Sequence, residues 1–265
     1  ISGGGALSEI IDIFLDASNI YVLEGYGLTE TSPVIAGRTY DNPIIFTVGA
    51  PIPETTVKIV DKEDHKREMP HGQSGIVMVK GDLVMKGYYK NEQKTQVVIR
   101  DGWFNTGDLG QKTYNGKYLK IIGRIKDTIV LRGGENVEPL PLEDKLKESP
   151  YINMVIIVGQ DKARLGALIV PNFEELSDYA QKNHIHYQDR KDLIKKKEIR
   201  SLFQWEQKRL VSRENGFQPF ETVMGIALLS APFTQEKREM TESLKLRRFV
   251  IHEIYQKEIE QICGQ

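Results

Sequence analysis

The stretch that most limits what this chain can fold into is residues 22–33. The apolar residues 20–23 lead into it and predict a short buried strand. Two glycines, a tyrosine and a polar run follow: Gly25-Tyr26-Gly27-Leu28-Thr29-Glu30-Thr31-Ser32. Glycines permit a tight loop and a close ligand, hydroxyls and N–H groups suit a phosphate, and a carboxylate suits Mg²⁺. An ordinary turn from a strand into a polar loop explains the same residues equally well, so both interpretations stay open at this point.

Two common nucleotide motifs are excluded. Glu30 stands where the Gly-x-Gly-x-x-Gly fingerprint of Rossmann folds needs its third glycine, and no glycine-opened helix follows. The only Gly-Lys pair, Gly116-Lys117, is followed by Tyr118 instead of the serine or threonine of a P-loop. Neither a Rossmann dinucleotide site nor a P-loop ATPase is therefore supported.

Composition limits the remaining classes. A length of 265 residues allows one large or two modest domains, and a net charge of −1 argues against nucleic acid as a partner. The single cysteine, Cys263, excludes a disulfide framework and suits a reducing cytoplasm. No apolar run approaches the ~20 residues of a membrane span. We expect a cytoplasmic protein and leave open peripheral contact with the inner membrane face and the oligomeric state. The start at Ile1, followed at once by a glycine run, leads us to expect a fragment of a longer polypeptide.

Apolar periodicity predicts two halves of different character. Helical spacing over residues 7–15 is followed by short strands at 57–61 and 76–81, which indicate a small sheet or barrel. A charged pivot at residues 124–127 separates two strand-like runs and marks a candidate domain boundary. Beyond it the pattern predicts helices over 140–148, 173–182, 191–213 and 244–262 and strands over 154–158, 165–170 and 226–229. We therefore expect an α+β second half.

Two further stretches carry candidate chemistry. The glycine run at residues 2–6 opens a predicted helix, where free N–H groups can seat an anion or a flat ligand, but a flexible leader is the simpler explanation. Asp108, in the glycine- and aromatic-rich stretch 101–110, could bind ribose hydroxyls because a carboxylate accepts two hydrogen bonds. An Asx-type turn explains Asp108 as well, and on these residues alone we favour the turn.

The order of the motifs is more specific than any one of them. The segments that carry it are Gly3–Ala6, Gly25–Thr31, Val48–Pro51, Val79–Gly81, Met85–Tyr89, Trp103–Asp108, Gly123–Asp127 and Gly133–Pro139. This series resembles the adenylate-forming superfamily of acyl-CoA synthetases, luciferases and adenylation domains, over essentially the whole chain. Residues 127–139 and the run Leu244-Lys245-Leu246-Arg247-Arg248 resemble the long-chain fatty acyl-CoA ligase branch.

The resemblance implies a fold and a reaction. The fold is α/β and α+β: residues 1–125 would be the C-terminal part of the large adenylate-binding domain with a small β-subdomain, and residues 126–265 a small mobile α+β domain. ATP and a fatty acid would give an acyl-adenylate and pyrophosphate, and coenzyme A would then take the acyl group as a thioester. The implied ligands are ATP or AMP, Mg²⁺, coenzyme A and a fatty acid.

The resemblance also implies residue roles. Gly4 and Gly5 would line the adenine and acyl side, Tyr26 and Gly27 would lie against adenine, and Thr29 would hold the α-phosphate. Further roles follow by motif: Glu30 for Mg²⁺, Asp108 and Arg124 for the ribose, Lys126 for the hinge between domains, Gly133 and Gly134 for the coenzyme A channel, and Lys245 for the adenylation step. Mg²⁺ and a lysine would stabilise the anionic charge that develops during adenylation.

Three departures from the family pattern shape our expectations. The phosphate loop and all sequence before it are absent, residues 235–243 lack the glycine and proline usual before the lysine, and Ile76 replaces a glutamate. We expect the parent protein to be a long-chain fatty acid–CoA ligase and this fragment to be inactive alone. An acyl–acyl-carrier-protein ligase would share every motif, and a non-catalytic remnant that binds nucleotide or a partner is the other alternative.

Overall fold

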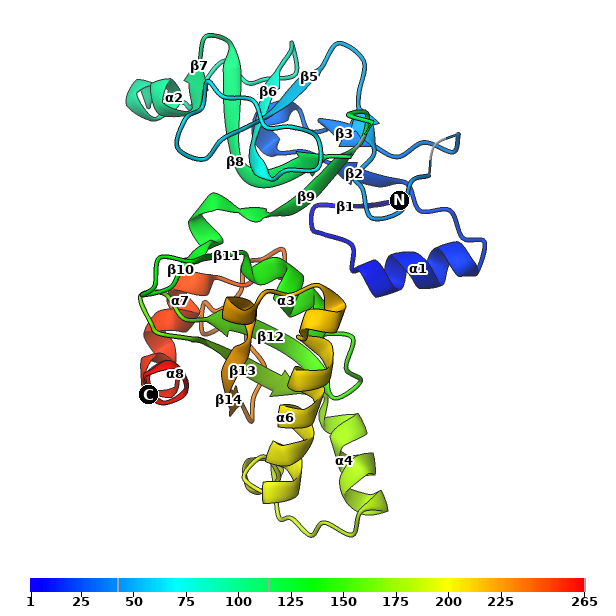
Figure 1. The fold of residues 1–265 in the computed structure, drawn as a ribbon, viewed down its shortest axis with the longest axis vertical. Helices are drawn as coiled ribbons and strands as arrows, with labels where there is room; N and C mark the ends of the chain where they lie inside the picture. Colours follow the sequence, from blue (N-terminus) through cyan, green and yellow to red (C-terminus); the bar gives the residue numbers. More distant parts are fainter. Residues whose placement is uncertain (42, 114, 265) are drawn as a thin grey trace. The chain divides into compact units, whose positions relative to one another are not determined.

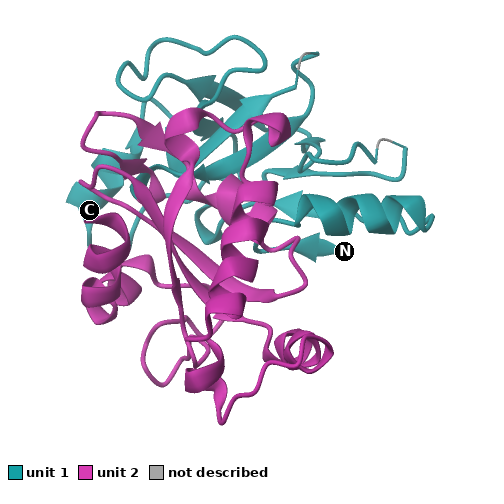
Figure 2. Ribbon diagram, turned by 60° about the horizontal axis from the view of Figure 1, so that its bottom comes forward, with its two compact units in different colours: residues 1–126 teal, residues 127–265 magenta. Residues whose placement is uncertain are grey.

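The computed structural model describes residues 1–41, 43–113 and 115–264. The chain divides into two compact units, Ile1–Lys126 and Asp127–Gln265, which Figure 2 colours teal and magenta. Each unit is described by itself below. No helix in the described ranges is both long enough and apolar enough to cross a membrane.

A small four-stranded sheet opens unit 1 (Figure 1). Its strands, in spatial order, are β1 (Ser2–Gly3), β2 (Glu24–Tyr26), β3 (Ala36–Gly37) and β4 (Ala50–Pro51). β1 and β2 are parallel, and the other neighbours are antiparallel. The helix predicted after the glycine run is confirmed as α1 (Glu9–Ala17). Its apolar residues Ile10, Ile13 and Phe14 are 45%, 49% and 66% exposed, so the described residues leave that face uncovered.

The predicted buried strand over residues 20–23 is wrong. Ile20 and Tyr21 are 52% and 59% exposed, and the strand begins at Glu24. The reason is local, because the N–H of Ile20 donates to the carbonyl of Leu15 and the chain is still ending α1 at this point. Hydrogen bonding to a helix C-terminus overrides the strand preference of the side chains here.

A second, antiparallel sheet forms the rest of unit 1. Its order is β5 (Thr56–Val60), β6 (Gly75–Lys80), β8 (Trp103–Lys112) and β7 (Ile99–Arg100), and β9 (Leu119–Arg124) also pairs with β8. A short helix, α2 (Glu92–Val98), precedes β7. The small sheet predicted from residues 57–61 and 76–81 is confirmed. The turn favoured for Asp108 is wrong, because the turn lies at residues 101–102 and Asp108 lies within β8.

Unit 2 is a three-stranded sheet covered by helices on both faces. A short hairpin, β10 (Ile129–Val130) and β11 (Asn136–Val137), precedes the sheet, whose order is β12 (Ile152–Val158), β13 (Leu165–Pro171) and β14 (Val223–Leu228). β12 and β13 are antiparallel, whereas β13 and β14 are parallel. The strands predicted in this half are confirmed, with boundary shifts of a few residues.

The two faces of this sheet bury separate apolar clusters. Odd-numbered residues of β13, and of β12 beyond the irregularity at residues 152–154, pack with α3 (Pro139–Leu146), α4 (Phe173–Lys182) and α6 (Lys197–Leu210). Even-numbered residues pack with α7 (Arg248–Ile254) and α8 (Gln256–Cys263). This alternation is the period of two expected of a strand that is buried on both faces.

Two long predicted helices are each interrupted. The helix expected over residues 191–213 is a short α5 (Arg190–Leu193) followed by α6, with a turn between them in which the N–H of Lys196 donates to the carbonyl of Leu193. The helix expected over residues 244–262 begins at Arg248 and divides at Tyr255. There the Tyr255 hydroxyl donates to Glu239 at 2.8 Å, and its ring packs edge-to-face on Phe233. Contacts distant in sequence therefore decide this break.

Candidate nucleotide-binding site

The glycine–tyrosine stretch forms β2 and a tight loop. A Cβ atom at Gly27 would lie 1.6 Å from the carbonyl oxygen of Pro33, so the backbone approach there requires glycine. A single 3₁₀ turn at Thr29–Thr31 follows. The hydroxyl of buried Thr31 holds this turn, since it accepts from the N–H of Leu28 and donates to the Leu28 carbonyl, both at 3.0 Å. The side chain of Thr29 is left exposed.

Three of the predicted nucleotide-binding residues are hydrogen-bonded to one another. The Tyr26 hydroxyl donates to Oδ2 of Asp108 at 2.7 Å, and Nε of Arg124 donates to Oδ1 at 2.6 Å. Asp108 is 4% exposed, whereas the Arg124 side chain is 46% exposed. They come from three strands, β2, β8 and β9, and Asp108 is the direct partner of Arg124 in the β8–β9 register.

Two hydrogen bonds do not use the full acceptor capacity of the Asp108 carboxylate. A carboxylate has about four acceptor positions, and Tyr26 and Arg124 occupy one on each oxygen. Burial, together with the neighbouring Asp108 charge, raises the pKa of Tyr26, so its hydroxyl stays a donor at neutral pH. By acceptor count, the carboxylate has capacity for two more hydrogen bonds, which is the number that a vicinal diol such as ribose donates.

Glu30 is held by a different neighbour. The Tyr88 hydroxyl donates to Oε1 of Glu30 at 2.9 Å, and the ammonium of Lys94 lies 4.0 Å from the centre of the Tyr88 ring. Burial and then the hydrogen bond to Glu30 raise the pKa of Tyr88, which keeps this hydroxyl protonated. Within the described ranges no group of three or more His, Cys, Asp or Glu side chains could hold a metal. Glu30 by itself still suits Mg²⁺, because this ion is commonly bound by one or two carboxylates together with substrate phosphates.

The glycine-rich opening lies beside the tyrosine. β1 pairs with β2 so that Gly3 is opposite Gly25, which places Gly4 and Gly5 at the end of the strand next to Tyr26. Gly4 has φ of +79°, a value that favours glycine, and a Cβ at Gly4 or Gly5 would contact nothing within 4 Å. The backbone is therefore open on this side, as the predicted role of both glycines requires.

A buried charge network that the sequence analysis missed supports this region. Both terminal nitrogens of Arg38 donate to Asp12 at 2.7 Å, and one of them also donates to Glu24 at 2.7 Å. Nε of Arg38 donates to the carbonyl of Thr47, and the Asp12 carboxylate accepts from the N–H of Phe46 at 2.9 Å. All three charged side chains are at most 6% exposed.

The network connects α1, β2 and the loop before β4. Glu24 directly precedes Gly25, and its other oxygen accepts from the N–H of Leu7 at 3.3 Å, at the end of the glycine run. Burial raises the pKa of Glu24, whereas for Asp12 the bonds from Arg38 and Phe46 outweigh burial and lower the pKa. The signal available in the sequence was Asp12, a carboxylate within the apolar spacing of a helix.

The remaining predicted residues lie elsewhere in the chain. Lys126 is exposed in the 3₁₀ turn Ile125–Asp127 at the end of unit 1. Gly133 and Gly134 form the exposed turn of the β10–β11 hairpin in unit 2, where Gly134 has φ of +90°. Lys245 is exposed in the segment before α7. The hinge, channel and adenylation roles of these residues stay predictions.

The unusual segment before Lys245 has its own anchor. Glu239 is 0% exposed, and its carboxylate accepts from the N–H of Thr234 and from the Tyr255 hydroxyl, both at 2.8 Å. Its carbonyl accepts from the N–H of Arg247. A buried carboxylate thus fixes residues 234–247, where the sequence lacks the expected glycine and proline.

Comparison with known proteins defines the class. Residues 1–89 match the family described as AMP-binding enzyme, and residues 126–264 match the AMP-binding enzyme C-terminal domain. The chain belongs to the AMP-binding enzyme family, and the resemblance to the adenylate-forming superfamily is confirmed.

Curated relatives refine this assignment. A probable chloroplastic acyl-activating enzyme of Arabidopsis thaliana is 40% identical, and a chloroplastic long-chain-fatty-acid–[acyl-carrier-protein] ligase of the same plant is 39% identical, each over 99% of this chain. A long-chain-fatty-acid–CoA ligase of Mycobacterium bovis is 33% identical over 100% of it. The chain spans only 37%, 35% and 42% of the lengths of these three relatives.

Solved structures confirm the fold class. The adenylation domain of a carboxylate reductase from Mycobacterium chelonae aligns with a TM-score of 0.77 and 25% identity, over 98% of this chain and 38% of that one. An ATP-bound chimera, RpMatB-BxBclM B1, aligns with a TM-score of 0.74 and 26% identity, over 96% and 45%. The chain has the mixed α/β fold of part of an adenylate-forming enzyme.

Proposed function

We propose that this chain is the C-terminal part of a ligase that activates a long-chain fatty acid with ATP through an acyl-adenylate. The observation that carries the proposal is the buried Asp108 carboxylate, whose two oxygens Tyr26 and Arg124 orient by one hydrogen bond each. A ribose diol is the ligand that this geometry suits best. Family membership supplies the rest of the reaction, and the names of the relatives supply the substrate class.

The residues of unit 1 would bind and orient ATP. Asp108 and Arg124 hold the ribose hydroxyls, and Tyr26 fixes the Asp108 carboxylate and lies against adenine with Gly27. Further contacts come from Gly4 and Gly5 on the adenine and acyl side and from the exposed hydroxyl of Thr29 on the α-phosphate. Glu30, oriented by Tyr88, would hold Mg²⁺, which neutralises phosphate charge when it is bound.

The roles proposed for unit 2 depend on movement. In our proposal, residues 1–125 and 126–265 are the two domains, and Lys126 is the hinge about which the second rotates between half-reactions. Lys245 donates to the reacting carboxylate and α-phosphate in the first half-reaction, and Gly133 and Gly134 border the coenzyme A channel in the second. Rotation of this kind exchanges one set of groups for another at a fixed site.

The acyl acceptor in this proposal is coenzyme A, with an acyl carrier protein as the alternative. The alternative has a specific basis, because the relative named for a carrier protein is 39% identical and the one named for coenzyme A is 33% identical. Supplying the intact protein with ATP, palmitate and either acceptor separates the two, since only the true acceptor gives a thioester at an enzymatic rate.

Asp108→Asn in the intact protein tests the nucleotide site. The amide keeps the shape but can no longer accept four hydrogen bonds as an anion, and hydrogen bonds to a charged group contribute about 1.5–3 kcal/mol each. We expect at least a tenfold rise in the ATP concentration that half-saturates fatty-acid-dependent pyrophosphate release. Asp101→Asn is the matched control, because Asp101 is exposed with φ of +52°, which asparagine tolerates. Equal effects of the two substitutions would refute the ribose role of Asp108.

A further inference from the structure

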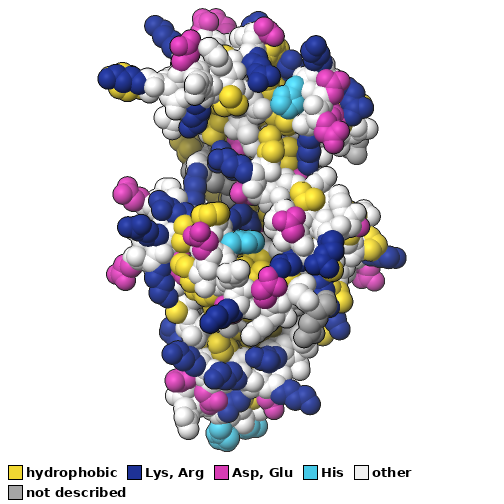
Figure 3. All heavy atoms as spheres, turned by 90° about the vertical axis from the view of Figure 1, so that its left-hand side faces the viewer, with side chains coloured by type: hydrophobic (Ala, Val, Ile, Leu, Met, Phe, Trp, Pro, Cys, Tyr) yellow, Lys and Arg dark blue, Asp and Glu magenta, His cyan; other side chains and the backbone are white. Residues whose placement is uncertain are grey.

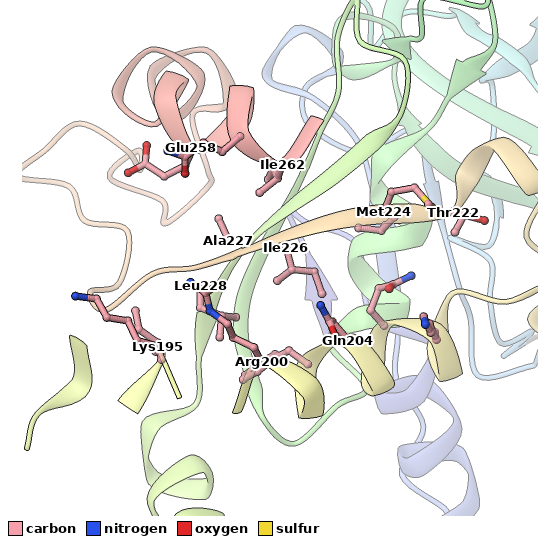
Figure 4. Close-up of a pocket in the computed structure, with 16 residues that line it drawn as sticks. Lys195, Arg200, Gln204, Thr222, Met224, Ile226, Ala227, Leu228, Glu258 and Ile262 are labelled. Atoms are coloured by element: carbon pink, nitrogen blue, oxygen red, sulfur yellow. The ribbon is translucent and has the colours of Figure 1, made fainter. Parts of the chain in front are cut away.

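A cavity lies within unit 2, and none of the residues assigned above lines it. It has a volume of about 660 Å³ and runs along β14 between α6 and α8 (Figure 4). Arg200 and Gln204 of α6 lie on one side of β14 in this view, and Glu258 and Ile262 of α8 lie on the other. The floor is the outer strand of the sheet, because in the described residues β14 pairs only with β13.

The backbone groups of alternate residues of β14 are not directed toward β13, so this strand has an unpaired edge along the cavity. Parallel strands bond through alternate residues, and the N–H of Leu229 donates to the carbonyl of Ile169 at 2.8 Å. With Ala227 paired to Leu168, the odd-numbered residues 225, 227 and 229 direct their backbone groups toward β13. The N–H and C=O groups of Ile226 and Leu228 therefore point to the open side. An open edge of this kind is a template for another strand.

The cavity wall is positively charged. Lys195, Arg200 and Lys208 line it, against one carboxylate, Glu258. In the described part of the chain, none of these three cations takes part in an ion pair with a carboxylate. Lys and Arg side chains, drawn in dark blue, are numerous on the face of the molecule shown in Figure 3. Those along the cavity differ because they flank unpaired backbone groups.

A buried, unpartnered donor also lines the cavity. Gln207 of α6 is 5% exposed, and its Nε2 amide has no hydrogen-bond partner. An unsatisfied buried donor destabilises the folded protein, and an acceptor supplied by an occupant would remove that penalty. This observation is independent of the strand edge and of the cations, and it points to an occupant that supplies a hydrogen-bond acceptor at this position.

We propose that this groove binds an extended, acidic peptide segment of a partner protein, which adds to the sheet beside β14 as a fourth strand. The peptide backbone pairs with Ile226 and Leu228, which gives affinity without sequence preference. Side chains of a strand alternate between faces, so every second residue of the peptide faces α6 and its cations. Carboxylates at those positions, with apolar residues between them facing Ile262 of α8, complement the groove. The proposal does not depend on the ligase activity.

Fluorescence anisotropy on the intact protein tests this proposal. The probe is a labelled nine-residue peptide with Glu at alternate positions and Val or Thr between them. One control peptide has the same composition with its glutamates contiguous, and another has N-methyl groups on alternate amides so that one edge cannot pair. We expect saturable binding of the alternating peptide, at least tenfold weaker binding of both controls, and weakening of all binding by salt.

Three variants locate the binding. Arg200→Glu reverses one charge at the cavity, and Lys182→Glu on α4 is its matched control away from it; we expect at least a tenfold loss for the first only. Ile226→Pro removes an edge N–H that the sheet itself does not use, and it should abolish binding while leaving circular dichroism unchanged. Gln207→Leu removes the unpartnered amide, so it should weaken the peptide complex while leaving the free protein at least as stable.

Several results of these binding measurements would contradict the proposal. Equal binding of all three peptides would show charge attraction without strand addition and would overturn the proposal. The same holds if the alternating peptide does not bind, or if Arg200→Glu and Ile226→Pro bind it as the unaltered protein does. A Gln207→Leu protein that is less stable when free would show that this amide already has an internal role.

Discussion

Replacing Arg38 by methionine should unfold unit 1 at much lower denaturant concentration. Methionine keeps much of the length of the side chain but removes every donor, so Asp12 and Glu24 remain buried without their cation. Breaking a buried ion pair by removing one partner typically costs about 3–5 kcal/mol, because a charge is left uncompensated. Arg38 serves two carboxylates and a backbone carbonyl, so we expect the upper part of that range.

The chain offers a clean optical assay for this loss. Its two tryptophans are divided between the units, Trp103 in unit 1 and Trp205 in unit 2, and Trp205 is 58% exposed. Trp205→Phe therefore provides a background in which urea unfolding of unit 1 is followed by Trp103 fluorescence alone. The difference in unfolding free energy between the Arg38→Met and Arg38 forms of this background is the measured quantity.

Two further measurements make the reasoning refutable. Without Arg38, burial raises the pKa of both carboxylates, so protonation relieves the penalty and the loss should shrink as pH falls from 7 to 4. Adding Asp12→Asn and Glu24→Gln to Arg38→Met should recover part of the stability, because no charge is then buried. A loss below about 1 kcal/mol would show that the network contributes little. A larger loss that does not change with pH would show that uncompensated charge on Asp12 and Glu24 is not its cause.

Three other predictions concern unit 2. Burial, and then the charge of Arg248, lower the pKa of His252 in the folded protein. Below about pH 6.5 the unfolded chain therefore binds a proton that the folded protein does not, and stability falls as pH is lowered. His252→Gln should reduce this pH dependence, measured by urea unfolding between about pH 7 and 5 in a Trp103→Phe background. Burial raises the pKa of Cys263 to about 11, so at pH 8 only about 0.1% is thiolate and iodoacetamide should label it after unfolding but not before. Lys245→Ala in the intact protein should slow adenylation by about 10²–10³-fold and leave thioester formation from supplied acyl-adenylate unchanged. Arg247→Ala is the control for simple loss of charge. Equal slowing of both steps by Lys245→Ala would contradict our proposal.

Elements with complete local signals could be predicted from the sequence. Residues 173–182 form the expected helix because Asn172 caps it, Glu174 and Glu175 occupy its first turn, and Lys182 occupies its last. The strands β5 and β6 of unit 1 and β12, β13 and β14 of unit 2 were also found, because their alternating or continuous apolar runs end at turn residues. Errors appear where hydrogen bonds from elsewhere decide, as for residues 20–23 beside the end of α1 and for Tyr255 between α7 and α8.

The candidate site was only partly accessible. Tyr26 and Asp108 are 82 residues apart, and no local pattern indicates that their side chains meet at 2.7 Å. Asp108 considered alone suggested a turn, and only the order of the motifs gave it a ligand-binding role. Arg38 could not be found at all, because an isolated arginine after a glycine looks like a surface residue until a fold places Asp12 and Glu24 around it.

Two buried carboxylates, Glu24 and Glu239, each hold a loop of this chain. Glu24 reaches back to the N–H of Leu7 at the end of the glycine run, and Glu239 accepts from Thr234 and Tyr255 in the segment before Lys245. Each is at most 6% exposed. A buried carboxylate needs hydrogen-bond donors from several directions, so it restricts the loop backbone at several points. A glycine or proline acts on the backbone mainly at its own position, but the carboxylate acts only in the folded state. Before Lys245, where the sequence departs from the family pattern, Glu239 therefore supplies an anchor of the segment through hydrogen bonds to Thr234, Tyr255 and Arg247.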